Sequence, residues 1–369
     1  MTTTRIRLFA LALLMVMLVA GCSRSEEKRQ QAGKNAAKTT VPAMAPGPVL
    51  LSGAGATFPA PLYQQWFSLY MKSHPGVVVK YEAVGSGAGI ERFMAKGVPD
   101  NKRVDFGASD AAMTDDEISG MESGVTMMPL TAGGVVLAYN IPGLQGRLRL
   151  SRKAYASIFL GKIQSWNDPV IKECNPGLNL PKLTIATVVR SDASGTTFAF
   201  TKHLAAISRQ WRESYGAAKL IDWPGRAMRA RGNEGGAGLV DQSAGAIGYM
   251  ELGFAQRLGL DTAVLENKAG NYITPSPRSA KASMASAVLP QNLRLFIPDP
   301  DGPDSYPIVT LTWVLLYDRY NDPQKVQTLK DLFSWCLHTG QTYSQPLGYL
   351  PLPDNIVRSA VAALSRITP

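Results

Sequence analysis

Four loops of this sequence combine glycine with small hydroxyl residues, and each loop stands between a predicted strand and a predicted helix. They span residues 52–58, 85–89, 107–110 and 190–197. Backbone N–H groups at the start of a helix lack internal partners, and the helix macrodipole adds partial positive charge there. One such loop is most simply an ordinary helix cap. Four of them, one with Arg190 and another with Asp110, predict a binding site for an oxyanion.

The elements around these loops alternate between strands and helices. Apolar strands are expected near residues 49–51, 77–84, 104–108 and 183–189, and helices are expected to begin near residues 59, 90, 115 and 198. This alternation predicts an α/β fold with mainly parallel sheets. Ligands of such sheets bind beyond the carboxyl ends of the strands, so the four loops are expected to meet.

Two longer strand patterns, at residues 133–140 and 308–317, suggest that the chain leaves one domain, builds a second and returns. We predict a first lobe from residues 49–131 plus 307–369 and a second lobe from residues 132–306. Two strands that cross between lobes form a hinge, and a hinge allows a cleft to close around a ligand.

The composition excludes several classes of protein. The chain has 369 residues, with 38 Lys and Arg against 28 Asp and Glu, and 45% of it is hydrophobic. These values exclude a disordered, collagenous or coiled-coil protein. The formal net charge of +10 is spread without a basic run or a nucleic-acid-binding motif, so we expect no nucleic-acid partner.

The three cysteines and three histidines leave little material for a metal centre or a disulfide scaffold. Cys174 and Cys336 could pair in an oxidising compartment. They fall in different predicted lobes, however, and a bridge would hinder closure. We favour two unpaired, buried thiols.

Catalytic motifs are mostly missing. The sequence contains no His-Glu-x-x-His and no Gly-x4-Gly-Lys-Ser/Thr, and residues 53–58 lack the third glycine of a dinucleotide-binding fingerprint. Residues 107–111 approach the Gly-x-Ser-x-Gly of hydrolases but end in alanine. We therefore expect a binding protein rather than an enzyme, with no catalytic residue, metal or cofactor.

The N-terminus has the pattern of an export signal. Arg5 and Arg7 precede an uncharged apolar run at residues 8–20, which is too short to span a bilayer. The run ends in Val-Ala-Gly-Cys22, similar to a bacterial lipoprotein box; the alternative is an ordinary signal peptide with an incidental cysteine. We predict a lipoprotein signal peptide at residues 1–21, then a lipidated Cys22 and a disordered tether at residues 22–48. The mature protein would be extracytoplasmic and anchored to a membrane.

The loop sequences resemble those of one family. Residues 52–61, 85–87, 104–111 and 190–196, together with residues 133–138, 159–168 and 245–249, closely resemble the phosphate-binding protein of the bacterial high-affinity phosphate ABC transporter, the PstS family. The resemblance extends from about Leu50 to the C-terminus. It implies a type II periplasmic-binding-protein fold, with two α/β lobes joined by a two-strand hinge and the ligand cleft between them.

The resemblance also implies which residues bind phosphate. These ligands are Thr57, Phe58, Ser86, Asp110, Arg190, Ser194, Gly195 and Thr196. Asp192 would orient the Arg190 guanidinium. The family's Gly-Ser-Ser-Gly is Gly85-Ser86-Gly87-Ala88 here, so the second serine and any hydrogen bond it makes are lost.

Asp110 would determine specificity. Phosphate keeps a proton at neutral pH and can donate it to an ionised carboxylate, whereas sulfate has no proton to donate. An unpaired buried acceptor costs about 1–3 kcal/mol, and charge repulsion adds to this, so Asp110 would reject sulfate. Arsenate, which is also protonated, would not be rejected. The alternative role of Asp110 is a helix cap.

The resemblance implies a receptor that closes on inorganic phosphate and docks on the membrane permease of a phosphate ABC transporter, and we expect this receptor to be a monomer. ATP would be hydrolysed by a separate cytoplasmic ATPase subunit. The alternatives are a receptor for another tetrahedral oxyanion, a phosphate sensor or adhesin without transport, and a phosphate-ester hydrolase that uses the same loops. The hydrolase would need a nucleophile or metals, for which the sequence offers no candidate.

Overall fold

The structure is a computed structural model that describes residues 47–285 and 287–369. Residues 47–369 form one compact unit. The predicted signal peptide and Cys22 lie outside the described residues, as does the predicted tether except for residues 47 and 48. Within the described ranges, no helix is both long and apolar enough to cross a membrane.

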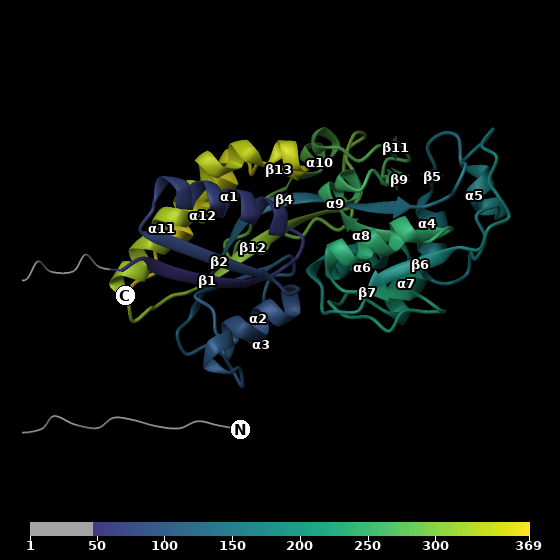
Figure 1. Cartoon of the computed structure of the whole chain (residues 1–369). Coiled ribbons are helices and arrows are strands. Elements are labelled where there is room, and N and C mark those ends of the chain that lie inside the picture. Colours follow the sequence, from purple (N-terminus) through teal and green to yellow (C-terminus); the bar gives the residue numbers. More distant parts are fainter. Residues whose placement is uncertain (1–46, 286) are drawn as a thin grey trace, which may run out of the picture. The chain divides into compact units, whose positions relative to one another are not determined.

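A single large mixed sheet organises the fold (Figure 1). Its strands follow the order β2-β1-β3-β12-β4-β8-β6-β7. In chain order they are β1 (Val49–Gly55), β2 (Val77–Ala83), β3 (Phe106–Ser109), β4 (Val125–Tyr139), β6 (Ala186–Arg190), β7 (Met228–Ala230), β8 (Ala246–Glu251) and β12 (Val309–Tyr317). Strands β2, β1 and β3 are parallel to one another, and so are β8, β6 and β7. The sheet therefore consists of two parallel groups joined through β12 and β4.

Strands β4 and β12 form an antiparallel pair at the centre of this sheet. Val309 of β12 is paired with Gly134 of β4, and the pairing continues to Tyr317 and Val125. The end of β4 instead pairs with β8, where Val135 faces Glu251. Strand β4 thus belongs to both groups, in agreement with the predicted two-lobe α/β fold. The predicted lobe boundaries, at residues 131/132 and 306/307, stay predictions.

The helices next to the predicted site follow strands directly. They are α1 (Ala60–Ser73), α2 (Ser86–Met94), α6 (Gly195–Ile207) and α8 (Gly232–Gln242). Prolines in the first turn of α1 fit a helix start, where their missing N–H costs nothing. The apolar face of α1 is buried through Leu62, Trp66 and Tyr70. Burial of this face fixes the direction in which the helix N-terminus points.

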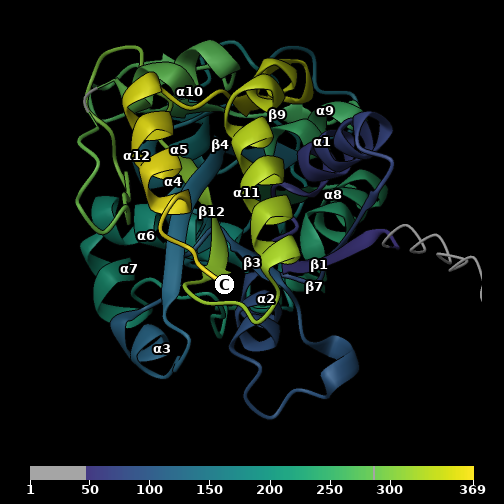
Figure 2. The same ribbon diagram turned by 90° about the vertical axis from the view of Figure 1, so that its left-hand side faces the viewer.

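The remaining helices cover the sheet or lie in connections. Helices α11 (Pro323–Leu337) and α12 (Asp354–Leu364) lie side by side (Figure 2). The other helical segments are η1 (Asp100–Lys102), α3 (Asp115–Ser119), α4 (Arg152–Phe159), α5 (Pro169–Glu173), α7 (Arg209–Ser214), α9 (Leu252–Arg257), α10 (Pro277–Met284), η2 (Thr339–Tyr343) and η3 (Gln345–Leu347). The predicted acidic helix is confirmed as α3, where Thr114 and Glu117 form a capping box.

Short strands complete the fold. Strands β9 (Asp261–Thr262) and β13 (Tyr349–Leu350) pair with β4, and β5 (Arg149–Leu150), β10 (Val264–Glu266) and β11 (Tyr272–Ile273) form a separate small sheet. Cys174 and Cys336 are both free thiols, as predicted. The prediction that both are buried is wrong for Cys174, which is half-buried because it ends the short helix α5 near the surface.

Candidate functional site

The four predicted anion loops meet at one place. The N–H of Gly87 donates to the carbonyl of Ala193 (2.8 Å), and the N–H of Asp110 donates to Oγ of Ser86 (3.2 Å). A Cβ added to Gly195 would lie 2.6 Å from the Asp110 Cβ and 2.6 Å from the Ser86 Oγ. Only a residue without a side chain fits there. The prediction that these loops converge is confirmed.

The side chains at this meeting point are removed from solvent. The residues are Ser86, Asp110, Arg190, Ser194 and Thr196, each at most 3% exposed, and Thr57 at 9%. A guanidinium and a carboxyl group thus lie together away from bulk solvent. Electrostatic interactions are strong in such a dry environment, and any unpaired polar atom is costly.

The first loop enters α1 with donors that have no internal acceptor. The N–H of Ala56 donates to the carbonyl of Ala108 (2.9 Å), which ties this loop to the third loop. Within the described ranges, the N–H groups of Thr57 and Phe58 donate to no protein atom. The carbonyl of Phe58 accepts a hydrogen bond from the Tyr349 hydroxyl (2.7 Å). These two hydrogen bonds hold the loop in place, while the N–H groups of Thr57 and Phe58 remain available to a ligand.

The second loop begins at Gly85, whose φ of 98° favours glycine because other side chains are strained there. Ser86 is the first residue of α2, and its hydroxyl lies next to Asp110. Gly87 occupies the position of the lost family serine, and its N–H donates to the carbonyl of Ala193. Ala88 lines a cavity together with Asp192.

Arg190 ends β6 and is clamped by Asp192. Its Nε donates to Asp192 Oδ1 (2.7 Å), and its Nη2 donates to Asp192 Oδ2. Asp192 Oδ1 also accepts from the N–H of Gly232 (3.1 Å). Burial alone would raise the pKa of Asp192, but the hydrogen bonds and charge of Arg190 outweigh it and lower that pKa. Arg190 Nη1 is buried and has no partner among the described residues, so its two N–H groups are left for a ligand.

Asp110 follows β3 and is almost completely buried. Burial raises the pKa of its carboxyl to about 7, against the opposing effects of a hydrogen bond from Thr312, the Arg190 charge and the Thr196 hydroxyl. The Thr312 hydroxyl donates to Asp110 Oδ1 at 2.8 Å. Near neutral pH this carboxyl can therefore either accept or donate a proton, which suits a site that distinguishes ligands by their protonation state.

The fourth loop caps α6. The Oγ of Ser194 accepts from the N–H of Thr197 (3.1 Å), and the N–H of Ser194 donates to the carbonyl of Lys219 (2.8 Å). Of the polar groups of Ser194, only the hydroxyl hydrogen is available to a ligand. No described residue accepts from the N–H groups of Gly195 and Thr196, as expected for the first turn of a helix.

Three residues at the site were not predicted from the sequence. Thr312 lies in the apolar strand β12, and Tyr249 lies in β8, where its hydroxyl accepts from the N–H of Arg190 (3.2 Å). Asn233 is the second residue of α8, and its side chain donates to Thr57 and Thr196. Of these three residues, only Asn233 lies in a sequence pattern that could have indicated the site. It follows Gly232 at the start of a helix, and the predicted anion loops also place glycine at helix starts.

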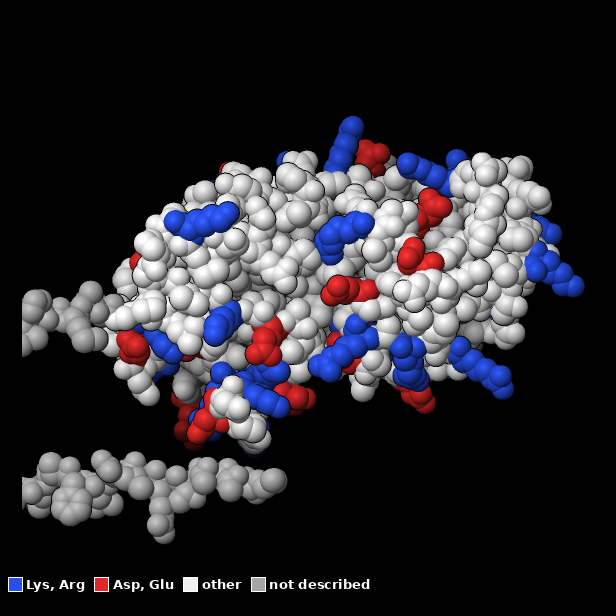
Figure 3. Space-filling model, in the orientation of Figure 1, with Lys and Arg blue, Asp and Glu red and all other residues white. Residues whose placement is uncertain are grey.

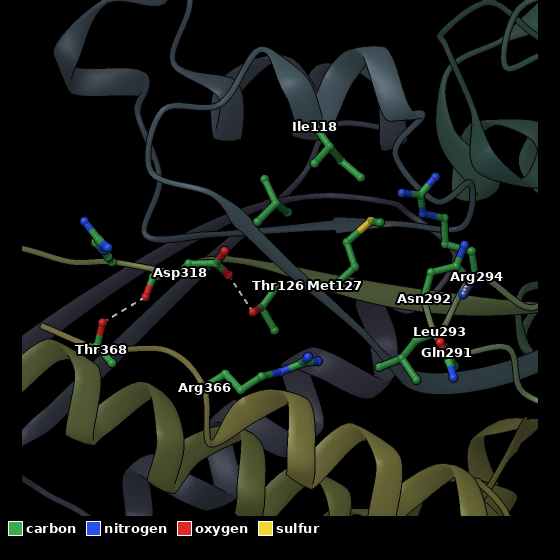
Figure 4. A pocket seen from close by; sticks show the side chains of 12 residues that line it. Ile118, Thr126, Met127, Gln291, Asn292, Leu293, Arg294, Asp318, Arg366 and Thr368 are labelled. Carbon is green, nitrogen blue, oxygen red and sulfur yellow. Dashed lines mark hydrogen bonds between the residues drawn. The ribbon is translucent and has the colours of Figure 1, made fainter.

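The cavities of the described surface differ in how close they come to this site. One cavity of about 490 Å³ is lined by Thr126, Asp318, Arg294 and Arg366 among others (Figure 4), and none of the predicted ligands borders it. A larger cavity of about 920 Å³ reaches Thr57. No group of His, Cys, Asp and Glu within the described ranges is arranged to hold a metal ion.

The chain matches the model of the PBP superfamily domain over residues 30–338. Phosphate-binding proteins PstS of Xylella fastidiosa and Pasteurella multocida are each 36% identical, over 95% and 85% of this chain and 95% and 89% of theirs. A solved periplasmic phosphate-binding protein, PfluDING bound with phosphate, shares the fold with a TM-score of 0.71 at 22% identity, over 85% of this chain and 93% of that one.

The two-group α/β sheet, the closed anion loops and the matched domain define a substrate-binding protein of the periplasmic type. At the level of sequence the relationship is more specific, because the identities hold over nearly the whole chain. The chain belongs to the PstS family of phosphate-binding proteins.

Proposed function

We propose that this protein is an extracytoplasmic receptor that binds one inorganic phosphate between its lobes and delivers it to the permease of a phosphate ABC transporter. The observation that carries the proposal is the buried, unpaired Nη1 of Arg190 beside the buried carboxyl of Asp110. An oxyanion that carries a proton complements both groups, because its oxygens accept from the guanidinium and its hydroxyl donates to the carboxylate.

The remaining donors complete the coordination. The N–H groups of Thr57, Phe58, Gly195 and Thr196 and the hydroxyls of Thr57, Ser86, Ser194 and Thr196 replace the water around the anion. These donors are held in place by folding, so little ordering is needed when the ligand binds. Binding without bond breaking is the whole of the proposed activity, and the names of the relatives, which describe binding proteins, support this.

We also propose that the protein acts as a monomer that is tethered to a membrane by a lipid on Cys22.

On the face shown in Figure 3, Lys and Arg are interspersed with Asp and Glu among many uncharged residues. Such a surface agrees with a protein whose charge does not serve nucleic-acid binding.

The test is calorimetric titration of phosphate into the purified chain after removal of bound phosphate, with sulfate as a competitor. We expect one site that excess sulfate does not occupy. Arg190→Gln should weaken phosphate binding by about a hundredfold or more, since a charge-assisted hydrogen bond is lost and Asp192 loses its cationic partner. Arg229→Gln, which removes an exposed arginine near Asp222, is the matched control.

Other results would redirect the assignment. Equal binding of sulfate would indicate a receptor for another oxyanion, and absence of any oxyanion binding would refute the proposal. The protein could also bind phosphate tightly while deletion of its gene leaves phosphate uptake unchanged. This pair of results would indicate a sensor or adhesin.

A further inference from the structure

Asn233 joins elements that are far apart in the sequence. It is completely buried at the start of α8, and its backbone N–H donates to Thr57 Oγ1 (3.1 Å) across 176 positions of sequence. Gly232, which precedes it, approaches the same threonine so closely that an added Cβ would lie 3.3 Å from Thr57 Cγ2. The start of α8 is thus packed directly against the first anion loop.

The hydrogen bonds fix the orientation of the Asn233 amide. Its Oδ1 accepts from the backbone N–H of Glu251 (2.9 Å), a group that can only donate. The Nδ2 must therefore face the other way, where it donates to Thr57 Oγ1 (2.9 Å) and to Thr196 Oγ1 (3.2 Å). One amide contacts two predicted phosphate ligands from two different loops.

These contacts limit what the Thr57 hydroxyl can do. A hydroxyl offers two acceptor lone pairs and one hydrogen. The N–H and the Nδ2 of Asn233 use both lone pairs of Thr57 Oγ1. The hydrogen of the Thr57 hydroxyl must therefore point away from Asn233. The Thr196 hydroxyl accepts only one hydrogen bond from Asn233, so only one of its two lone pairs is occupied in this way.

We propose that Asn233 is a positioning residue of the anion site: it directs the hydroxyl hydrogen of Thr57 toward the bound anion and, through Thr196, links the first and fourth loops in the closed form. This inference rests on the proposed function, because it assumes that the Thr57 hydroxyl binds phosphate. Asn233 itself touches no ligand atom.

The experiment is a set of double-mutant cycles on the purified chain, with inorganic phosphate as the probe and calorimetry and stopped-flow kinetics as readouts. Asn233→Ala should weaken phosphate binding by about tenfold, mainly through faster dissociation. Asn233→Asp should weaken it by about a hundredfold, because the new carboxylate only accepts and would capture the Thr57 hydrogen. Asn140→Ala is the matched control, since the Asn140 amide also donates to the backbone of α8, at Val240 and Asp241 near the other end of that helix.

Coupling to Thr57 separates positioning from general stability. In a Thr57→Val background, which has no hydroxyl to orient, Asn233→Ala should weaken binding by no more than about threefold, whereas in a Thr57→Ser background the tenfold effect should remain. Asn233→Ser keeps a small polar side chain and replaces Asn233→Ala if that variant does not fold, as judged by thermal melting.

Two results would overturn the inference. One is an equal loss of affinity from Asn233→Ala in the Thr57→Val and Thr57→Ser backgrounds, and the other is an Asn233→Asp variant that binds phosphate like the unmodified chain. If the unmodified chain binds no phosphate, the proposed function fails together with this inference. If the unmodified chain binds phosphate but the cycles show no coupling, only the positioning role fails.

Discussion

The hydroxyl of Thr312 donates a 2.8 Å hydrogen bond to the carboxyl of Asp110 across 202 positions of sequence. Thr312 lies on the central strand β12, whereas Asp110 lies at the end of β3, in one of the anion loops. A donated hydrogen bond favours the charged carboxylate and so opposes the effect of burial. The protonation of Asp110 thus depends on a residue of the strand pair that joins both groups of the sheet.

The first prediction concerns selectivity and pH. Asp110 has a pKa of about 7, so below that pH it is protonated and can donate to sulfate. Sulfate affinity should therefore fall by about tenfold per pH unit above pH 7, because sulfate brings no proton of its own. Phosphate affinity should fall less steeply, since phosphate can supply the shared proton. Calorimetry with both anions at several pH values measures this difference.

Asp110→Asn is the variant for this prediction. Its amide donates at every pH, so sulfate affinity at pH 8 should rise by about tenfold or more and lose its pH dependence. If the variant rejects sulfate to the same extent as the unmodified chain, Asp110 does not discriminate between the anions. Asp116→Asn, in the exposed first turn of α3, is the control.

A second prediction follows from the contact of Thr312 with Asp110. Thr312→Val keeps the shape of the side chain but removes a hydrogen bond that lowers the pKa of Asp110. The pKa should rise above 7, and sulfate should then bind up to a higher pH than in the unmodified chain. The titration of the carboxyl carbon by NMR measures the shift directly. An unchanged midpoint would contradict the role of Thr312, and Thr310→Val on the same strand is the comparison.

The third prediction uses the close approach at Gly195. A methyl group there would lie 2.6 Å from both the Asp110 Cβ and the Ser86 Oγ. Gly195→Ala should therefore hold the loops apart, weaken phosphate binding by about tenfold to a hundredfold and lower the melting temperature, because overpacking of a buried site also destabilises the fold. Gly238→Ala, which adds a methyl group to α8 in open space, should bind normally. Normal binding by Gly195→Ala would mean that the loops do not need this contact.

A fourth prediction concerns stability rather than binding. Burial raises the pKa of Glu251 to about 8, although a backbone N–H and the Arg257 charge oppose the shift. The folded state then holds this proton more tightly than the unfolded state, whose glutamate has an ordinary pKa of about 4.3. The stabilisation is complete below about pH 4, falls at about 1.4 kcal/mol per pH unit between the two pKa values, and is lost as pH rises through 8.

Glu251→Gln should remove this part of the pH dependence. Free energies of unfolding in urea at pH 6 and pH 8.5 should differ less in this variant than in the unmodified chain. Glu213→Gln, which removes an exposed carboxylate paired with Arg209, should leave the difference unchanged. An identical pH dependence in Glu251→Gln and the unmodified chain would indicate that Glu251 does not titrate in this range.

The local features of this protein were predictable from its sequence. The acidic start of α3 and the glycine and hydroxyl residues before α2 and α6 are signals within a few residues of each other. The resemblance to the phosphate-binding family then suggested how the loops combine. That Ser194 would donate its hydroxyl but not its N–H was not predictable, because the acceptor, Lys219, is set by tertiary packing.

The long-range partners of the site could not be predicted in this way. In the sequence, Thr312 is one of two threonines in an otherwise mainly apolar strand, and Asn233 is an ordinary residue near a helix start. Their roles arise because they meet Asp110 and Thr57 only after the chain has folded. Side chains that support a site from distant strands leave no spacing pattern in the sequence.

The register between β4 and β12 shifts between Thr312 and Trp313. Such an irregularity bends and twists a strand locally, and here it falls beside the residue that contacts Asp110. Substitutions that alter this bend would move the Thr312 donor without touching any anion-binding loop. Phosphate affinity can therefore be changed by substitutions in the middle of the sheet. Natural variation or engineering could in this way adapt the protein to other phosphate concentrations without changing the anion-binding loops.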